Sequence, residues 1–163
     1  MAIKVYKRNN AGRRNMSVVK AESVSYAKQP EKSLMAPMKS RAGRSHGKIS
    51  VRHQGGGHKQ RYRIIDFKQN KYDIPGRIAA IERDPMRSAF IALINYRDGE
   101  KKYIVASEGM EAGMDIMCSP TAPIKLGNRT QVKSIPTGTV ISASNYFQTK
   151  ERKLCAALDQ KRF

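Results

Sequence analysis

Residues 88–107, SAFIALINYRDGEKKYIVAS, hold two strand-like runs that are separated by Asp98 and Gly99. The first run, 88–97, is almost continuously apolar, which is typical of a strand buried on both faces or at the inner turn of a barrel. An Asp-Gly pair between two such runs is a strong hairpin signal, because both residues tolerate the positive φ of a type I′ turn. We therefore predict a β-hairpin with a type I′ turn at the centre of the fold.

Further short apolar runs flank this hairpin on both sides. They cover residues 61–67, 77–83, 114–118, 123–126 and 138–141. In the run 61–67, Tyr62 and Ile64 should share one face and Arg61 and Arg63 the other. About six short strands without a long helix between them favour a mainly β protein with a small barrel. An OB-like barrel matches the size of this region, and an SH3-like barrel also fits.

The last segment of the sequence has a different periodicity. From Thr149 to about Lys161, the apolar residues Leu154, Ala157 and Leu158 would share one face of a helix, and Thr149 could cap its start. We predict a helix of about three turns here, a length that is marginal in isolation. Such a helix would pack on the barrel or form a docking surface for another chain.

The charge of the chain is large and unevenly distributed. The 163 residues carry a formal net charge of +19, of which +14 lies in residues 1–68. A field of this strength indicates a polyanionic partner, and nucleic acid is the usual one. The first segment is also too poor in apolar residues to order itself, so we expect that a polyanion orders it. The sequence has neither an apolar run of membrane-spanning length nor the apolar core of a signal peptide.

The stretch 51–67, VRHQGGGHKQRYRIIDF, combines three glycines with two histidines and several cations. It lacks the GK[ST] of a nucleotide-binding phosphate loop. A zinc site at His46, His53 and His58 would have no fourth ligand. A Ser-His-Asp type of catalytic site is not indicated either, because no acidic residue is placed to orient the histidine of a serine–histidine pair. Glycines let the backbone approach phosphates, while cations neutralise them and planar side chains stack on bases. The pattern therefore favours an RNA-gripping loop over an enzyme or a metal site.

Several segments between about residue 41 and residue 141 match the sequence pattern of a known protein family. They include RHQGGGHKQRYRIIDFK (52–68), IERDPMRSAFIALINYRDGEKKYI (81–104), IKLGN (124–128) and IPTGTV (135–140), preceded by GRR (12–14), GR and GKIS. In these segments the chain resembles the N-terminal part of the family of universal large-ribosomal-subunit protein two. The resemblance implies a basic rRNA-binding extension with the glycine loop over 1–60 and an OB-like barrel over 61–141. Residues 142–163 form a tail that diverges from the family, and the periodicity described above predicts that it is helical.

The resemblance also implies the residues that contact RNA. They are Arg13, Arg14, Arg41, Arg44, Lys48, Arg52, His53, Gly55, Gly56, Gly57, His58, Lys59, Arg61, Arg63, Lys68, Arg87 and Ser88. Met86 stands where this family is expected to have an asparagine in the turn before Arg87, so a side-chain contact is not expected from that position. No catalytic residue and no metal ligand are transferred to this chain.

The expected function is that of a structural component of the large ribosomal subunit that clamps large-subunit rRNA and supports subunit association and the architecture of the peptidyl-transferase centre. Because the second half of the family pattern is missing after about Ile141, we expect a separate chain with the C-terminal half, and a mitochondrial ribosome rather than a bacterial or plastid one. Other expected partners are neighbouring ribosomal proteins, with no membrane. No cofactor is expected, although rRNA can carry structural Mg²⁺. The alternative is a free OB-fold protein that binds single-stranded RNA outside the ribosome.

Overall fold

The computed structural model describes residues 2–20, 29–38, 42–55, 58, 60–147 and 153–158, and for residues 2, 20, 145–147 and 153–158 it describes the backbone alone. Its strands are β1 (Ala2–Val5), β2 (Ser17–Lys20), β3 (Met35–Ala36), β4 (Arg44–Ser45), β5 (Lys48–Ile49), β6 (Tyr62–Arg63), β7 (Gly76–Arg83), β8 (Phe90–Tyr96), β9 (Lys101–Val105), β10 (Asp115–Ile116), β11 (Arg129–Gln131), β12 (Ile141–Phe147) and β13 (Lys153–Leu158). Its short 3₁₀ turns are η1 (Ala11–Arg13), η2 (Lys32–Leu34) and η3 (Val132–Ser134). No helix in these described ranges is long and apolar enough to cross a membrane.

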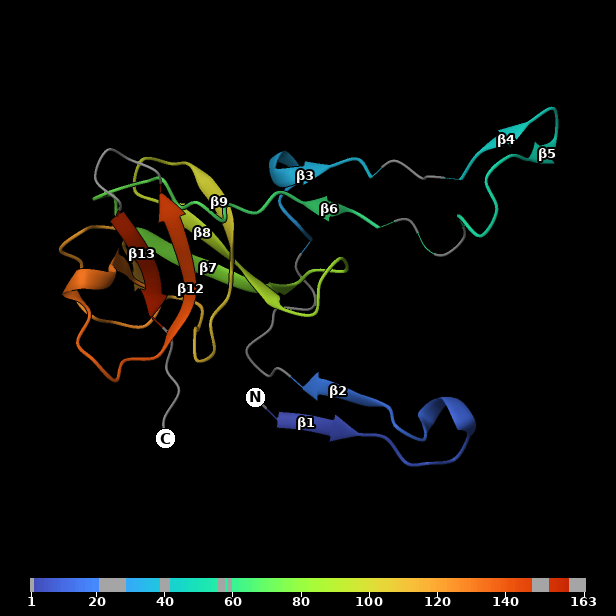
Figure 1. Cartoon of the computed structure of the whole chain (residues 1–163), viewed down its shortest axis with the longest axis horizontal. Helices are drawn as coiled ribbons and strands as arrows, with labels where there is room; N and C mark the ends of the chain where they lie inside the picture. The colour runs from blue at the N-terminus through green and yellow to red at the C-terminus, as the bar shows by residue number, and fades with distance from the viewer. Residues whose placement is uncertain are drawn as a thin grey trace.

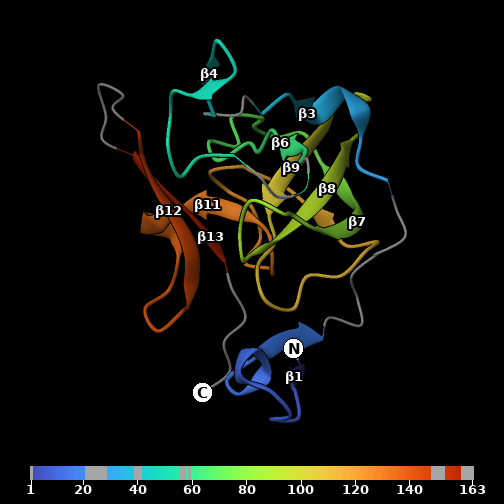
Figure 2. The same cartoon turned by 90° about the vertical axis from the view of Figure 1, so that its right-hand side faces the viewer.

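The main sheet contains the hairpin that the sequence predicts. Its four strands lie in the order β10-β7-β8-β9, with antiparallel pairing throughout. A register shift between Ile78 and Ala80 interrupts the β7–β8 ladder, and such bulges increase the local twist and bend of a sheet. The sheet curls into a half-barrel (Figure 1 and Figure 2). The protein is therefore mainly β, as predicted, and this sheet fits a small OB-like barrel.

The hairpin between β8 and β9 is confirmed, but its turn differs from the predicted one. Within this turn only Gly99 takes a positive φ, of 87°. The amide of Gly99 donates to the carbonyl of Tyr96 at 3.0 Å, and the amide of Tyr96 donates to the carbonyl of Glu100 at 2.9 Å. The connection is thus a three-residue loop that ends in a left-handed glycine, which is the next commonest hairpin type after the two-residue turns.

Strand β8 is buried on both faces, as its apolar sequence predicts. One face contributes Ala92, Ile94 and Tyr96 to the larger core cluster. The other face contributes Ile91 and Leu93, which pack with Tyr103 of β9 and with the partly buried Leu34 and Ile65. The second face is therefore covered in part by residues that precede the main sheet in the sequence. This contact determines where the basic N-terminal segment leaves the sheet.

The predicted C-terminal helix is wrong for the residues that the structure describes there. Residues Lys153–Leu158 form β13, the central strand of a three-stranded sheet in the order β11-β13-β12. The pairing partners include Arg129 with Ala157 and Tyr146 with Leu154. Pairing on both edges of β13 provides hydrogen-bond partners for its backbone groups. A helix of three turns would be only marginally stable in isolation. The remainder of the predicted helix, 149–152 and 159–161, lies outside the described residues.

The weaker strand predictions have mixed outcomes. The run 114–118 contains β10, and β12 begins at Ile141, the last residue of the run 138–141. The run 123–126 is not a strand, and β11 begins instead at Arg129. In the run 61–67 the faces are inverted, because Arg63 is buried whereas Tyr62 and Ile64 are exposed. Alternation in the sequence gave the period of this strand, but not the face that is covered.

Two buried tyrosines make stability depend on alkaline pH. Burial raises the pKa of both Tyr96 and Tyr103 from 10.0 to about 12. Because the folded state holds these protons more tightly, the stabilisation is complete below pH 10 and is lost as the pH rises from 10 towards 12. Urea unfolding at several pH values should show that the free energy of unfolding falls between pH 10 and pH 12. In Tyr96→Phe this fall of the free energy with pH should be less steep. An unchanged slope in the variant would assign the loss to the lysines, which titrate in the same range.

Candidate nucleic-acid interface

The basic segment before the barrel is attached to the main sheet at one place. We call this place, residues 31–36 together with residues 62–64, the arm root. Strand β3 pairs with β6 through Met35 with Arg63 and Ala36 with Tyr62. The amide of Ile64 continues this ladder by donating to the carbonyl of Leu34 at 2.9 Å. We call residues 42–61 the arm; it runs between these two paired strands and extends away from the main sheet (Figure 1). The segments by which the chain leaves and re-enters the barrel, β3 and β6, therefore lie side by side.

A buried tyrosine holds the arm root in place. The hydroxyl of Tyr103 accepts a hydrogen bond from the amide of Glu31 at 3.0 Å and donates one to Glu82 Oε2 at 3.0 Å. Lys101 Nζ lies 2.8 Å from Glu31 Oε2, and Leu34 packs on the core. The expectation that the first 68 residues need an outside partner to become ordered is therefore wrong at the arm root, where the barrel provides the contacts.

The far end of the arm is a tight hairpin. Strands β4 and β5 pair through Arg44 with Ile49 and Ser45 with Lys48. The two residues between them, His46 and Gly47, both have positive φ, at 46° and 74°. This is the backbone of a type I′ turn, which connects two-residue hairpins. Both Arg44 and Lys48 are exposed there, so the turn presents two cations at the point of the arm most distant from the sheet (Figure 1).

The glycine loop follows this hairpin. Gly55 has φ 93°, and a Cβ atom added to it would lie 2.9 Å from the Cβ of Ala42. His53 also takes a positive φ, of 56°. Glycine is required at 55 on both counts, because an L side chain would be strained and would collide. The two segments of the arm that contain Ala42 and Gly55 therefore approach each other closely.

Most of the predicted RNA-contact residues that the structure describes are exposed. Exposed members of the arm are Arg44, Lys48, Arg52, His53, Gly55, His58 and Arg61. Lys68 and Ser88 are exposed on the barrel, and Arg13 and Arg14 are exposed at η1, in the hairpin of β1 and β2. Arg41, Gly56, Gly57 and Lys59 lie outside the described residues. The structure brings together the arm members, whereas Arg13 and Arg14 belong to a separate hairpin.

Arg63 differs from the other predicted contacts. Its side chain is 9% exposed, and its Nη1 donates to the carbonyl of Arg61 at 2.8 Å. In β6 it pairs in register with Met35 of β3. This placement makes Arg63 part of the arm root rather than of the exposed cationic surface.

Arg87 lies in the turn after β7 and is held by a buried acid. Its Nη1 forms an ion pair with Asp84 Oδ2, and the side chain of Asp84 is fully buried. Asp84 Oδ1 also accepts from the amide of Met86 at 3.0 Å. The guanidinium lies 6.0 Å from the ring centre of Tyr62 and 5.8 Å from that of Phe67. These distances are at the outer limit of cation–π contact.

Sequence reasoning did not place Tyr62 and Phe67 together beside Arg87. Tyr62 is 36% exposed and Phe67 is 57% exposed, whereas Tyr96 and Tyr103 are buried. The inverted face of residues 62–64 explains this, since β6 pairs with β3 and not with a strand of the main sheet. The cationic neighbours Arg61 and Lys68 were the signal that could have indicated an exposed ring.

The acidic residues that could have suggested a metal-dependent enzyme are engaged in local contacts. Asp98 and Glu100 pair with Lys71, which raises the pKa of Lys71 and lowers that of Asp98. Glu82 accepts from Tyr103, and Asp84 pairs with Arg87. Within the described residues, no three His, Cys, Asp or Glu side chains are placed to hold a metal ion. These acids therefore have structural roles.

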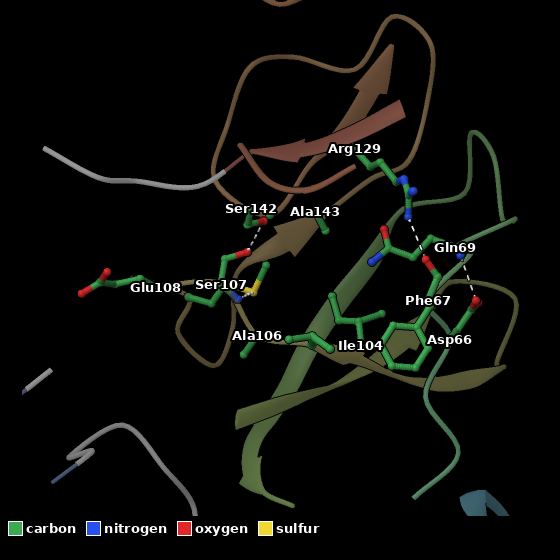
Figure 3. Close-up of a pocket in the computed structure, with 13 residues that line it drawn as sticks. Asp66, Phe67, Gln69, Ile104, Ala106, Ser107, Glu108, Arg129, Ser142 and Ala143 are labelled. Carbon is green, nitrogen blue, oxygen red and sulfur yellow. Dashed lines mark hydrogen bonds between the residues drawn. The ribbon is translucent and has the colours of Figure 1, made fainter. Parts of the chain in front are cut away.

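A small cavity opens between the main sheet and β12 (Figure 3). Its volume is about 180 Å³. Ser107 Oγ and Ser142 Oγ lie 3.1 Å apart on one wall, and on the other Arg129 Nη1 donates to the carbonyl of Phe67 at 3.2 Å. No histidine lines the cavity to activate a serine. Its visible role is structural, because Arg129 fixes the backbone of Phe67.

An exposed cationic arm on a curled β-sheet defines a nucleic-acid-binding protein of the OB-like type. A comparison with protein-family models matches residues 31–118 to the RNA-binding N-terminal domain of the ribosomal proteins L2. The chain belongs to this family, which consists of structural RNA-binding proteins of the ribosome and not of enzymes. The matched range includes the arm root, the arm, the main sheet and Arg87.

Proposed function

We propose that the chain is a structural component of the large ribosomal subunit that binds and clamps large-subunit rRNA. The observation that carries this proposal is the family match over residues 31–118, which covers the whole exposed cationic arm. In this role the chain supports subunit association and the architecture of the peptidyl-transferase centre. It performs no chemical step, and any Mg²⁺ at the interface is bound through the rRNA.

The arm acts by neutralising phosphates at close range. Its cations lie on a narrow two-stranded element, so phosphates on both sides of it can be contacted at once. Arg44 and Lys48 at the hairpin reach deepest into the RNA, and Arg52 and Arg61 follow towards the barrel. Each contact releases condensed counterions from the RNA, and this release drives binding.

The glycine loop brings the backbone itself to the phosphate chain. Gly55, Gly56 and Gly57 carry no side chain that could hold the RNA away, and amides in left-handed turns form small anion-binding sites. His53 and His58 flank the loop with planar donors, and Lys59 adds a cation. Arg87 and Ser88 provide a second contact on the barrel, and Arg13, Arg14, Arg41 and Lys68 complete the proposed set.

One observation favours the alternative of a free OB-fold protein that binds single-stranded RNA. Such proteins stack bases on exposed aromatic rings, and Tyr62 and Phe67 are exposed. The two functions differ in the RNA that is preferred. A mitochondrial ribosome and a separate chain with the C-terminal half stay predictions.

The test is binding of the full chain to transcripts of large-subunit rRNA over a range of salt concentrations. With about eight phosphate contacts, log K against log salt should fall with a slope of roughly −6 to −7. A folded large-subunit transcript should be preferred over a small-subunit transcript of equal length. Equal affinity for both transcripts and for unstructured RNA would contradict the ribosomal role and support the free binder.

A further inference from the structure

Tyr62, Phe67 and Arg87 form a cluster on the barrel surface that we call the stacking cluster. The two rings are 36% and 57% exposed, and the guanidinium of Arg87 lies within 6.0 Å of both ring centres. Tyr62 belongs to β6, the strand through which the chain returns from the arm. The cluster thus adjoins the cationic surface described above, at the arm root.

Local contacts hold Phe67 in its exposed position. Asp66 Oδ1 accepts from the amides of Lys68 and Gln69 at 3.1 and 2.8 Å, which closes a turn around the ring. The carbonyl of Phe67 accepts from Arg129 Nη1, whose side chain is only 2% exposed (Figure 3). A buried arginine therefore fixes the backbone of an exposed phenylalanine, so little of the backbone has to be ordered when the ring binds a ligand.

Arg87 and Tyr62 are also held by contacts within the chain. Arg87 is paired with the buried carboxylate of Asp84, which also accepts from the amide of Met86. Tyr62 is paired in register with Ala36 of β3. The side chain of Arg87 and the backbones of Tyr62 and Phe67 are therefore positioned before any ligand arrives. Exposed planar rings with an arginine beside them, in a cationic surface, suit the flat groups that a polyanion carries.

We propose that the stacking cluster binds unpaired bases of the RNA, with Tyr62 and Phe67 as stacking surfaces and Arg87 as their cationic partner. Bases in a duplex hide their faces, whereas bases in loops and bulges can splay out and stack on aromatic side chains. This inference rests on the proposed RNA-binding function and adds a division of labour to it. The arm binds the phosphate backbone, and the barrel binds looped-out bases.

The test compares two RNAs of about 12 nucleotides, within the site size of an OB-type barrel. One is a single-stranded oligouridine, and the other is its abasic form with the same phosphates. The full chain should bind the oligouridine about tenfold more tightly, because stacking acts only on the form with bases. Phe67→Leu and Tyr62→Leu should each remove most of this difference and leave the salt slope unchanged.

Two further variants separate stacking from other effects. Phe67→Tyr keeps a ring and should keep the discrimination, whereas Tyr72→Leu removes an exposed tyrosine outside the cluster and should change nothing. Tight but equal binding of both RNAs by the unaltered chain would overturn the stacking role and leave the phosphate-binding function standing. Failure to bind either RNA would overturn both proposals.

Discussion

Replacing Arg44, Lys48, Arg52 and Arg61 together by alanine should weaken binding of large-subunit rRNA by about a thousandfold at about 0.1 M salt. The four side chains are exposed on the arm, and each lost phosphate contact removes about 0.7–0.9 from the salt slope. The slope should therefore become shallower by about 3. A single replacement among them should matter little. The measurement is filter binding of the full chain over a range of salt concentrations.

The control removes the same charge from the barrel. Arg83, Arg97, Lys125 and Lys133 are also exposed, and their joint replacement by alanine lowers the net charge equally. This variant should lose about tenfold or less, because long-range attraction is screened beyond about 10 Å. Equal losses in the two variants would show that the total charge binds the RNA and that the arm has no special role.

Tyr103→Phe should reduce the free energy of unfolding by about 3 kcal/mol, because it leaves a partly buried amide and a buried carboxylate each short of a partner. The lost hydroxyl joins the amide of Glu31 to the carboxylate of Glu82. The loss should be concentrated at the arm root, so the amides of Glu31 and Ile64 should exchange hydrogen faster. Urea unfolding gives the total loss, and hydrogen exchange locates it.

Tyr96→Phe is the matched control for this variant. Tyr96 is also a buried tyrosine of the main sheet, but its hydroxyl makes no hydrogen bond within the described part of the chain. Its removal should change stability by about 0.5 kcal/mol or less. If Tyr103→Phe were as mild as Tyr96→Phe, the arm root would be held by Leu34, the Lys101–Glu31 ion pair and the β3–β6 pairing without help from the Tyr103 hydroxyl.

The centre of the fold could be predicted from the sequence because its signals are local. The apolar run 88–97 and the Asp98-Gly99 pair determine β8, β9 and the hairpin between them. The turn type was not determined by these two residues, because a loop with Arg97 as a third residue satisfies the same strands. The family segments likewise indicated the glycine loop and Arg87 before any geometry was known.

The arm root could not be predicted because its contacts join residues far apart in the sequence. Glu31 meets Tyr103 across 72 residues, and no local pattern indicates this pair. The pairing of β6 with β3 also joins distant residues, and the alternation in residues 61–64 did not indicate that Arg63 would be buried and Tyr62 exposed. In the tail, KLCAAL is short enough to fit either period, and pairing with β11 and β12 decides for a strand.

The most direct test of the ribosomal assignment is sedimentation of the tagged chain from gently lysed cells through a sucrose gradient, with RNA sequencing and mass spectrometry of each fraction. The chain should sediment with large-subunit rRNA and large-subunit proteins, and the four-fold arm variant should move to the top of the gradient. A wild-type chain that remains at low density, bound to assorted RNA or to none, would contradict the ribosomal role.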